Sequence, residues 1–461
     1  MKVKAWKSGS SGEPKFPAKF KIVKKSVLQK TNISNNNNKY YAIELHEAKG
    51  KFRVFTHYGR TDDLNTNPNA GNKESRYCDD AEEAEALYNS IYKQKTGTRK
   101  GYQQVNLASS KIGSQQAQGQ SCGKIDDKTL TKLKKKETKQ KTAKPSIDKP
   151  VADLVSYLYS EAVKTLTTTV NASITANGIE TPLGVLTIGQ IDMGQTILDK
   201  IAMAANKKRR NKEELSTLSG QFYTAIPHRL GRSRQSVEEA VITTPDDVVA
   251  KNDTLQLMRD MLNINGESNV LTSSEIGQKY QALNCDIGCL NKTEFSRIKK
   301  YVEGSSKRRN VAIKHIWQIS RSTEQKDFNS RISNEKLLFH GSSVSNWVGI
   351  LSRGILLPKA VVKLGVHRTD AGWLGHGIYL GDDIQTSCAY APCGRRGTMF
   401  IGIARVALGK VKKYKKITYG LTSPPQGFHS CHGIKGSEFD DDEFVIYKQN
   451  QQKLEYLIEC T

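Results

Sequence analysis

Short apolar runs in the last third of the chain each have one reactive side chain at an edge. His340 closes one such run, Tyr379 lies inside a second, and Glu443 directly precedes a third. A short apolar run bounded by polar residues is typical of a buried strand, and a reactive group at its edge is held beside a cleft. We therefore expect buried strands to hold His340, Tyr379 and Glu443 at a cleft.

The wider pattern over residues 278–461 predicts a β-rich domain with short helices. The strand candidates are residues 337–340, 378–380, 399–406, 444–447 and 456–458. Residues 382–390 have the pattern of a short helix, which would bring Ser387 and Tyr390 beside Tyr379.

This set of side chains suits a particular bond cleavage. Ordinary glycosidases pair an acid with a second carboxylate because a neutral leaving group must be protonated. The nicotinamide of NAD+ is already a cation and leaves neutral, so one carboxylate is enough. Glu443 would stabilise the growing positive charge on the ribose and orient an incoming hydroxyl. Tyr379 would stack on the nicotinamide ring, and His340 would hydrogen-bond a ribose hydroxyl.

The same residues resemble a known family. Residues 338–342, with His340, Gly341 and Ser342, and residues 377–379 are similar to the motifs of the poly(ADP-ribose) polymerase family, which has the diphtheria-toxin-like ADP-ribosyltransferase fold. The resemblance implies NAD+ as the substrate and no metal. It implies that the Gly341 backbone and the Ser387 hydroxyl hydrogen-bond to the carboxamide of nicotinamide. It also implies that Tyr379 and Tyr390 stack on the two faces of the nicotinamide ring. Within the family, residues 365–380 and 439–447 are most similar to the vault-associated member.

Charge separates the front of the chain from the rear. The chain has 71 Lys and Arg against 46 Asp and Glu, and residues 1–150 contain 31 of the basic residues but only 15 of the acidic ones. A basic N-terminal third, here called the basic front, precedes a remainder in which acidic and basic residues are nearly balanced. This distribution predicts a polyanion-binding module attached to an enzyme. An excess of Lys that only aids solubility is the alternative.

Residues 1–105 predict a β-rich domain. Residues 40–45 and 52–55 have strand patterns, and residues 80–95 form an amphipathic helix pattern with Ala84, Leu87, Ile91 and Tyr92 on one face. Together with the Gly-Arg turn, this arrangement is similar to a WGR domain, although Tyr58 stands where the family has Trp. The resemblance implies contact with DNA breaks, in which Tyr58 stacks on a base or sugar and Arg60 binds phosphate. A protein-binding or purely structural β-domain is the alternative.

The middle of the chain divides in two. Residues 106–148 are rich in Ser, Gln, Gly and Lys and predict a flexible basic linker, whose Lys-rich run at 132–141 is a candidate nuclear-localisation signal or polyanion tether. Residues 149–277 have helical periodicity, with further helices beginning at 183–186. The motifs at 182–186 and 222–228 are similar to the helical regulatory domain of DNA-dependent family members. The fold class is therefore α+β multidomain: a WGR-like domain, an all-α regulatory bundle and an ADP-ribosyltransferase domain.

These features predict a sequence of events. DNA or another polyanion docks on the basic front, the helical domain that shields the NAD+ cleft loosens, and ADP-ribose passes to protein acceptors, including the enzyme itself. Polymer formation is the favoured product. A mono-ADP-ribosyltransferase and a catalytically silent nucleic-acid-binding protein remain as alternatives. The chain lacks a C-x-x-C pair and a membrane-length apolar run, and a nuclear location is expected for a eukaryotic source, a cytoplasmic one otherwise.

Overall fold

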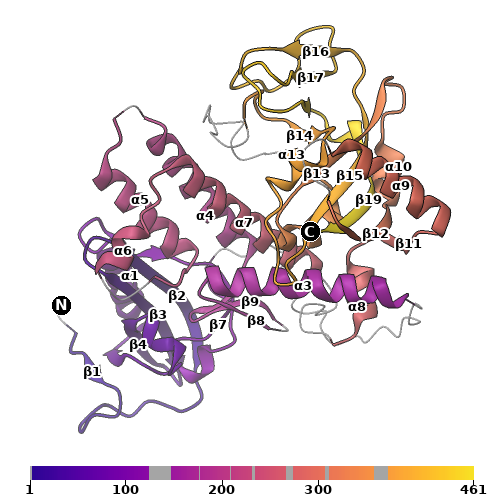
Figure 1. Ribbon diagram of the computed structural model, residues 1–461. Helices are drawn as coiled ribbons and strands as arrows, with labels where there is room; N and C mark the ends of the chain where they lie inside the picture. The colour runs from indigo at the N-terminus through magenta and orange to yellow at the C-terminus, as the bar shows by residue number, and fades with distance from the viewer. Residues whose placement is uncertain are drawn as a thin grey trace. The chain divides into compact units, whose positions relative to one another are not determined.

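A computed structural model describes residues 3–123, 147–175, 177–207, 209–230, 234–265, 274–306, 311–357 and 372–461. The chain divides into two units (Figure 1). The first comprises Met1–Thr138 and Thr167–Thr243, and the second comprises Lys139–Leu166 and Thr244–Thr461. The predicted helical domain is therefore shared between the two units.

The first unit is built on a six-stranded antiparallel sheet in the order β1-β5-β4-β3-β2-β6. Its strands are β1 (Trp6–Lys7), β2 (Lys21–Asn32), β3 (Asn37–Ala48), β4 (Lys51–Arg60), β5 (Asn72–Cys78) and β6 (Gln103–Gln104). The two strands predicted at residues 40–45 and 52–55 are confirmed as the central pair β3 and β4.

Helix α1 (Ala81–Thr96) packs on one face of this sheet (Figure 1). It begins after Asp80, whose carboxylate accepts a hydrogen bond from the Glu83 amide at 2.8 Å and caps the first turn. The predicted helix over 80–95 is confirmed to within one residue. Its most buried large side chain is Tyr88, while Leu87 is only partly buried.

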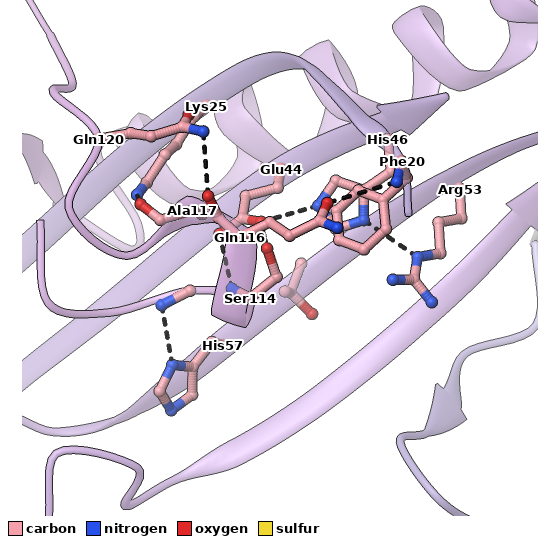
Figure 2. Close-up of polar contacts among 12 residues, drawn as sticks. Phe20, Lys25, Glu44, His46, Arg53, His57, Ser114, Gln116, Ala117 and Gln120 are labelled. Atoms are coloured by element: carbon pink, nitrogen blue, oxygen red, sulfur yellow. Dashed lines mark hydrogen bonds and ion pairs between the residues drawn. The ribbon is translucent and has the colours of Figure 1, made fainter. Parts of the chain in front are cut away.

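The opposite face of the sheet carries a buried polar network (Figure 2). Glu44 and His46 alternate with the core residues of β3 and point away from α1. The Glu44 carboxylate accepts from His46 Nε2 at 2.7 Å and from both the amide (2.9 Å) and hydroxyl (2.5 Å) of Ser114. The bonds from His46 and Ser114 outweigh the cost of burial, so the pKa of Glu44 is lowered, whereas burial lowers the pKa of His46. The pair therefore holds an ionised glutamate and a neutral histidine.

Residues 106–123 cover this network. They were predicted to belong to a flexible linker, but the structure shows them as an ordered segment. They contain β7 (Leu107–Ser110) and the 3-10 turn η2 (Gln115–Ala117), and Leu107, Ile112 and Ala117 are fully buried or nearly so. Lys25 donates to the Ala117 carbonyl at 2.6 Å and ties the segment to β2. The basic run at 132–141 lies outside the described residues.

Strand β7 also pairs with part of the predicted helical domain. It forms a four-stranded sheet, β7-β10-β9-β8, with β8 (Ser173–Thr175), β9 (Gly178–Thr181) and β10 (Gly184–Leu186). Helices were predicted to begin at 183–186, but residues 184–186 form β10. Helix α4 (Ile188–Ala205) begins after Thr187, whose hydroxyl accepts from the Gln190 amide at 3.1 Å. Helices α5 (Lys212–Ala225) and α6 (Arg234–Glu239) follow in this unit.

The second unit is built on a nine-stranded sheet in the order β11-β12-β19-β15-β13-β14-β18-β17-β16. Its strands are β11 (Asp286–Cys289), β12 (Ile313–Ser320), β13 (Glu335–Gly341), β14 (Ile378–Gly381), β15 (Met399–Ala407), β16 (Val411–Tyr414), β17 (Ser430–Gly433), β18 (Glu443–Ile446) and β19 (Gln452–Cys460). All neighbours are antiparallel except β16 and β17. Each of the five strands predicted in this region is present.

Helices surround this sheet within the second unit. They are α3 (Lys149–Thr169, most of which belongs here), α7 (Pro245–Asn265), α8 (Ile276–Ala282), α9 (Lys292–Ser305), α10 (Ser322–Asp327), α11 (Trp347–Arg353) and α13 (Ile384–Cys388). A core of side chains from β12, β13, β15 and β19 packs against α9 and α13. Within the described residues, no helix is both long enough and apolar enough to cross a bilayer.

Candidate active site

Three neighbouring strands carry the three residues singled out from the sequence. In the register of the sheet, Phe339 of β13 lies opposite Gly381 of β14, and Gly381 lies opposite Glu443 of β18. His340 follows Phe339, and Tyr379 lies two residues before Gly381. The sheet therefore brings together the three strands that carry His340, Tyr379 and Glu443, which lie in separate segments of the chain.

The His340 ring is fixed by the neighbouring strand. Its Nδ1 lies 3.1 Å from the Tyr379 carbonyl oxygen, and because a carbonyl can only accept, Nδ1 carries the hydrogen. Burial lowers the pKa of His340, which keeps the ring neutral near pH 7. Nε2 is then an unprotonated acceptor, able to take a hydrogen bond from a hydroxyl group.

The Tyr379 side chain is held by the turn that precedes its own strand. Its hydroxyl donates to the Gly375 carbonyl at 2.8 Å and accepts from the Leu374 amide at 3.0 Å. With the hydroxyl anchored, the ring has a set orientation and can serve as a stacking surface. Residues 365–371, part of the stretch similar to the vault-associated member, lie outside the described residues.

Helix α13 lies against the end of β13. A Cβ added to Gly341 would lie 1.9 Å from the Ser387 carbonyl oxygen, so only glycine permits this approach. Ser387 is buried within α13, and Tyr390 follows the helix with its ring half exposed. The contact brings Ser387 next to Gly341. Both residues were expected to bind the carboxamide of nicotinamide, which requires them to lie close together.

Ser342 has a local structural contact. Its hydroxyl accepts from Asn346 Nδ2 at 3.2 Å, and its carbonyl accepts from the Trp347 indole at 3.3 Å. These bonds hold the turn between β13 and α11, because Trp347 opens that helix and is fully buried. Ser342 therefore supports the end of β13, where His340 and Gly341 lie.

Glu443 is a partly buried carboxylate at the first position of β18. Burial, followed by the negative charges of Asp441 and Asp440, raises its pKa to about 7. A group with this pKa exchanges protons near neutral pH, which suits a catalytic base.

The two aspartates before Glu443 make contacts that the sequence did not indicate. Asp441 accepts from the Thr386 hydroxyl at 2.9 Å and from Lys435 Nζ at 2.7 Å, so it joins α13 to the turn before β18. Asp442 pairs with His432 Nε2 at 2.7 Å. The run of three aspartates is in part a scaffold for Glu443, and no spacing in the sequence identifies partners six to 55 residues away.

Tyr58 and Arg60, predicted to contact nucleic acid, lie at the end of β4 in the first unit. The Tyr58 ring stacks on Tyr41 with centroids 5.1 Å apart, and its hydroxyl donates to Glu74 at 2.7 Å. Burial and that carboxylate raise the pKa of Tyr58 to about 12. Arg60 pairs with Asp62 at 3.2 Å and keeps 38% of its side chain exposed. The Arg60 guanidinium remains partly accessible, whereas Tyr41 covers one face of the Tyr58 ring.

Metal coordination finds no support in the described part of the chain. No group of three or more His, Cys, Asp or Glu side chains there is placed to hold a metal ion.

Three family models match consecutive stretches of the chain. Residues 24–108 match the WGR domain, residues 146–280 the poly(ADP-ribose) polymerase regulatory domain, and residues 292–438 the poly(ADP-ribose) polymerase catalytic domain. The chain belongs to the poly(ADP-ribose) polymerase family. The catalytic-domain match includes His340, Tyr379 and Ser387 and ends five residues before Glu443.

Several curated family members are similar to the chain. Protein mono-ADP-ribosyltransferase PARP4 of Mus musculus is 35% identical over 68% of the chain, but the match spans only 16% of that protein. Protein mono-ADP-ribosyltransferase PARP3 of Mus musculus is 26% identical over 94% of the chain and 87% of its own length. Poly [ADP-ribose] polymerase 2-A of Oryza sativa subsp. japonica is 26% identical over 91% of the chain.

Proposed function

We propose that this protein is an NAD+-dependent protein ADP-ribosyltransferase that DNA breaks stimulate. The observation that carries the proposal is the placement of Glu443 at the start of β18, in one register with β14 and β13. The carboxylate has a pKa of about 7 and lies on the strand that pairs with β14, and β14 carries the anchored Tyr379 ring and the carbonyl that holds the neutral His340 imidazole. Cleaving a bond to a cationic leaving group requires one such carboxylate and no general acid.

Each residue has a role in the proposed transfer. The Glu443 carboxylate stabilises the positive charge that grows on the ribose as nicotinamide leaves, and it accepts the proton of the attacking hydroxyl. His340 Nε2 accepts a hydrogen bond from a ribose hydroxyl and so fixes the dinucleotide. Tyr379 and Tyr390 flank the nicotinamide ring. The Gly341 backbone and the Ser387 hydroxyl bind the carboxamide, with Ser342 holding the end of the strand.

Binding to DNA is proposed for the first unit. The WGR-domain match and the basic excess of residues 1–150 support it. Arg60 is the proposed phosphate contact, because part of its guanidinium remains exposed. Tyr58 is the proposed stacking residue, because its ring is partly exposed whereas the Tyr41 ring stacked on it is buried.

Restraint of the catalytic strands by helices α3 and α7 is proposed as the basis of regulation. Asp260 of α7 is buried and accepts two hydrogen bonds from the Arg353 guanidinium, at 2.7 and 2.9 Å. Glu161 of α3 pairs with Arg395 at 2.6 Å, and the Arg396 guanidinium lies 4.0 Å from the centre of the Tyr157 ring. A hundredfold activation requires about 2.7 kcal/mol of differential DNA binding, which a few phosphate contacts can supply.

Two products are candidates, a chain of ADP-ribose units and a single ADP-ribose. Retention of Glu443 supports polymer formation, because the same carboxylate can activate the hydroxyl of an ADP-ribose already attached. The alternative, a single addition, is supported by the segment between β15 and β18, which spans only residues 408–442. It is also supported by two similar relatives, PARP4 and PARP3, which are mono-ADP-ribosyltransferases by name.

One assay tests these proposals together. The purified chain is incubated with labelled NAD+, with and without nicked DNA, and the products are separated by size. A ladder indicates polymer, and a discrete shift indicates single addition. Absence of label in the presence of DNA would refute the transferase and leave a nucleic-acid-binding protein. Equal labelling with and without DNA would refute the stimulation.

The proposed setting is the response to DNA damage in the nucleus of a eukaryotic cell. Its proposed partners are broken DNA and acceptor proteins, among them the enzyme itself. Localisation of the tagged protein before and after DNA damage tests this setting. A protein that stays outside the nucleus under both conditions would contradict it.

A further inference from the structure

The outermost strand of the nine-stranded sheet carries a dense run of lysines. Strand β16 is last in the order of that sheet, and among the described residues it pairs only with β17 (Figure 1). Residues 410–416, here called the basic edge, contain five lysines, and no Asp or Glu occurs between residues 408 and 437. Within the described part of the chain, none of these five lysines forms an ion pair with a carboxylate. The basic edge therefore presents positive charge to solvent.

The backbone of β16 is hydrogen-bonded on one side. The carbonyls of Lys410 and Tyr414 accept hydrogen bonds from amides at the two ends of β17, at 2.8 and 3.0 Å, so the even-numbered residues face β17. In a parallel pair the backbone groups of alternate residues point to opposite sides of the strand, so the amides and carbonyls of Val411 and Lys413 point outward. Among the described residues, no group hydrogen-bonds to these two amides and two carbonyls.

The lysines of the basic edge lie on both faces of the sheet. The ammonium groups of Lys410 and Lys412 share one face and lie 5.0 and 5.6 Å from the centre of the Phe428 ring. Lys413 and Lys415 alternate with them, belong to the opposite face and are exposed. A strand placed alongside β16 would therefore meet lysines on each face, which suits a run of consecutive acidic side chains.

We propose that the outer edge of β16 docks an extended acidic segment of a partner protein as an additional strand. The backbone groups of Val411 and Lys413 would pair with the segment, and its Asp or Glu side chains would pair with the lysines on both faces. A second copy of β16 does not fit this edge, because its own lysines would be repelled. Nucleic acid has no peptide groups to pair with a strand, so the outward-pointing backbone favours a peptide.

The docked segment would lie near the candidate active site. Tyr414 lies opposite Gly433 of β17, and Gly433 lies opposite Glu443 of β18. Neighbouring strands are about 4.8 Å apart, so the docked strand would lie three spacings, or about 14 Å, from Glu443. About five extended residues span that distance. A side chain placed that far from the acidic run would reach the carboxylate.

This consequence rests on the proposed function. A serine at that distance would be favoured as the acceptor of ADP-ribose. Its hydroxyl oxygen forms the new bond to the ribose as the bond to nicotinamide breaks, and its proton passes to Glu443.

Binding is tested on the full-length protein by fluorescence anisotropy with a labelled peptide that contains six consecutive glutamates. We expect saturable binding that weakens as salt rises, and no binding of the same peptide with glutamine in place of glutamate. A third peptide has a methyl group on each amide nitrogen of the glutamate run, which keeps the charge but removes the strand hydrogen bonds. It should bind roughly tenfold more weakly or worse. Equal binding of the methylated and unmethylated peptides would overturn the strand pairing.

Matched substitutions locate the binding site. Lys413→Gln combined with Lys415→Gln should weaken peptide binding roughly three- to tenfold. Lys299→Gln combined with Lys300→Gln, at two exposed lysines of α9, should bind as wild type. Unchanged binding in the first variant would place the peptide elsewhere and overturn the proposal. Loss of nicked-DNA binding in that variant, together with no effect of amide methylation, would make the basic edge a nucleic-acid surface and overturn it as well.

Transfer to the docked segment is tested separately with labelled NAD+. The peptide now carries a serine five residues before and another five residues after the glutamate run. Its labelling should exceed that of the glutamine version by roughly three- to tenfold, and the Lys413→Gln, Lys415→Gln variant should lose the difference. Equal labelling of the two peptides would refute acceptor selection. No NAD+ turnover on any acceptor would refute the proposed function, while the anisotropy would still decide the docking.

Discussion

The pKa of Glu443 predicts a steep dependence of activity on pH around neutrality. Burial and the charges of Asp441 and Asp440 raise this pKa to about 7, and the transfer requires the ionised carboxylate. About 9% of the free enzyme is then active at pH 6 and about 91% at pH 8, so kcat/KM should rise about tenfold. A carboxyl with its ordinary pKa would be almost fully ionised at both values and would give a flat profile. Burial lowers the pKa of His340, which favours its neutral form over this range.

A single surface substitution should move the midpoint. Asp440 is exposed and acts on Glu443 through its charge, so Asp440→Asn should shift the rising limb to lower pH without removing a group from the site. Asp441→Asn should shift it in the same direction, but it also removes the acceptor of Thr386 and Lys435. The first variant is therefore the cleaner test of charge.

The assay is the initial rate of nicotinamide release at low NAD+ concentration and saturating nicked DNA, measured from pH 5.5 to pH 8.5. Low NAD+ reports kcat/KM, which follows the ionisation of the free enzyme. DNA binding measured in parallel confirms that occupancy is constant. A profile that is flat between pH 6 and pH 8, or a midpoint that Asp440→Asn leaves unchanged, would refute the reasoning.

The remaining predictions concern the carboxylate, the histidine, the basic front and the restraining helix. Glu443→Gln should abolish elongation and slow transfer by roughly a hundredfold or more, and His340→Ala should raise the KM for NAD+ as well as slow turnover; normal kinetics in both would contradict the site. Because the raised pKa of Glu443 makes ionisation costly in the folded state, stability is lost as pH rises through about 7, so Glu443→Gln should raise the Tm relative to wild type at pH 8 and not at pH 4. Arg60→Glu should weaken DNA stimulation, more so at high salt, and an unchanged response in a DNA titration would place the contact elsewhere. Asp260→Asn should raise DNA-free activity by about 5- to 150-fold, whereas Lys299→Ala, which breaks an exposed pair on α9, should have no effect.

Local sequence patterns identified most of the strands of the second unit, and they identified His340, Tyr379 and Glu443 as candidate site residues. Apolar runs beside His340, Tyr379 and Glu443 mark β13, β14 and β18 because buried strands need continuous apolar side chains. Their order in the sheet depends on pairing between distant segments, which periodicity does not encode. The placement of Ser387 against Gly341 was expected only through the family resemblance.

The buried network of the first unit could not be predicted from the sequence in this way. Glu44 and His46 alternate with apolar neighbours, a pattern that ordinarily indicates a solvent-facing side of a strand. They are buried because residues 106–123, with little hydrophobic content, fold across them and supply the Ser114 amide and hydroxyl to Glu44. Polar composition indicated a linker, but specific hydrogen bonds to a buried carboxylate order the segment instead.

The pairing of β7 with β10 bears on where fragments of this protein should begin and end. Ending a fragment at residue 105 would remove β7 and leave Glu44 without the Ser114 amide and hydroxyl that hydrogen-bond to its carboxylate. Such a fragment would expose to water the sheet face that residues 106–123 normally cover, and we expect it to be less stable than the whole unit. A fragment that retains residues 1–243 keeps the strand partners and the helices α4 and α5 that belong to the same unit.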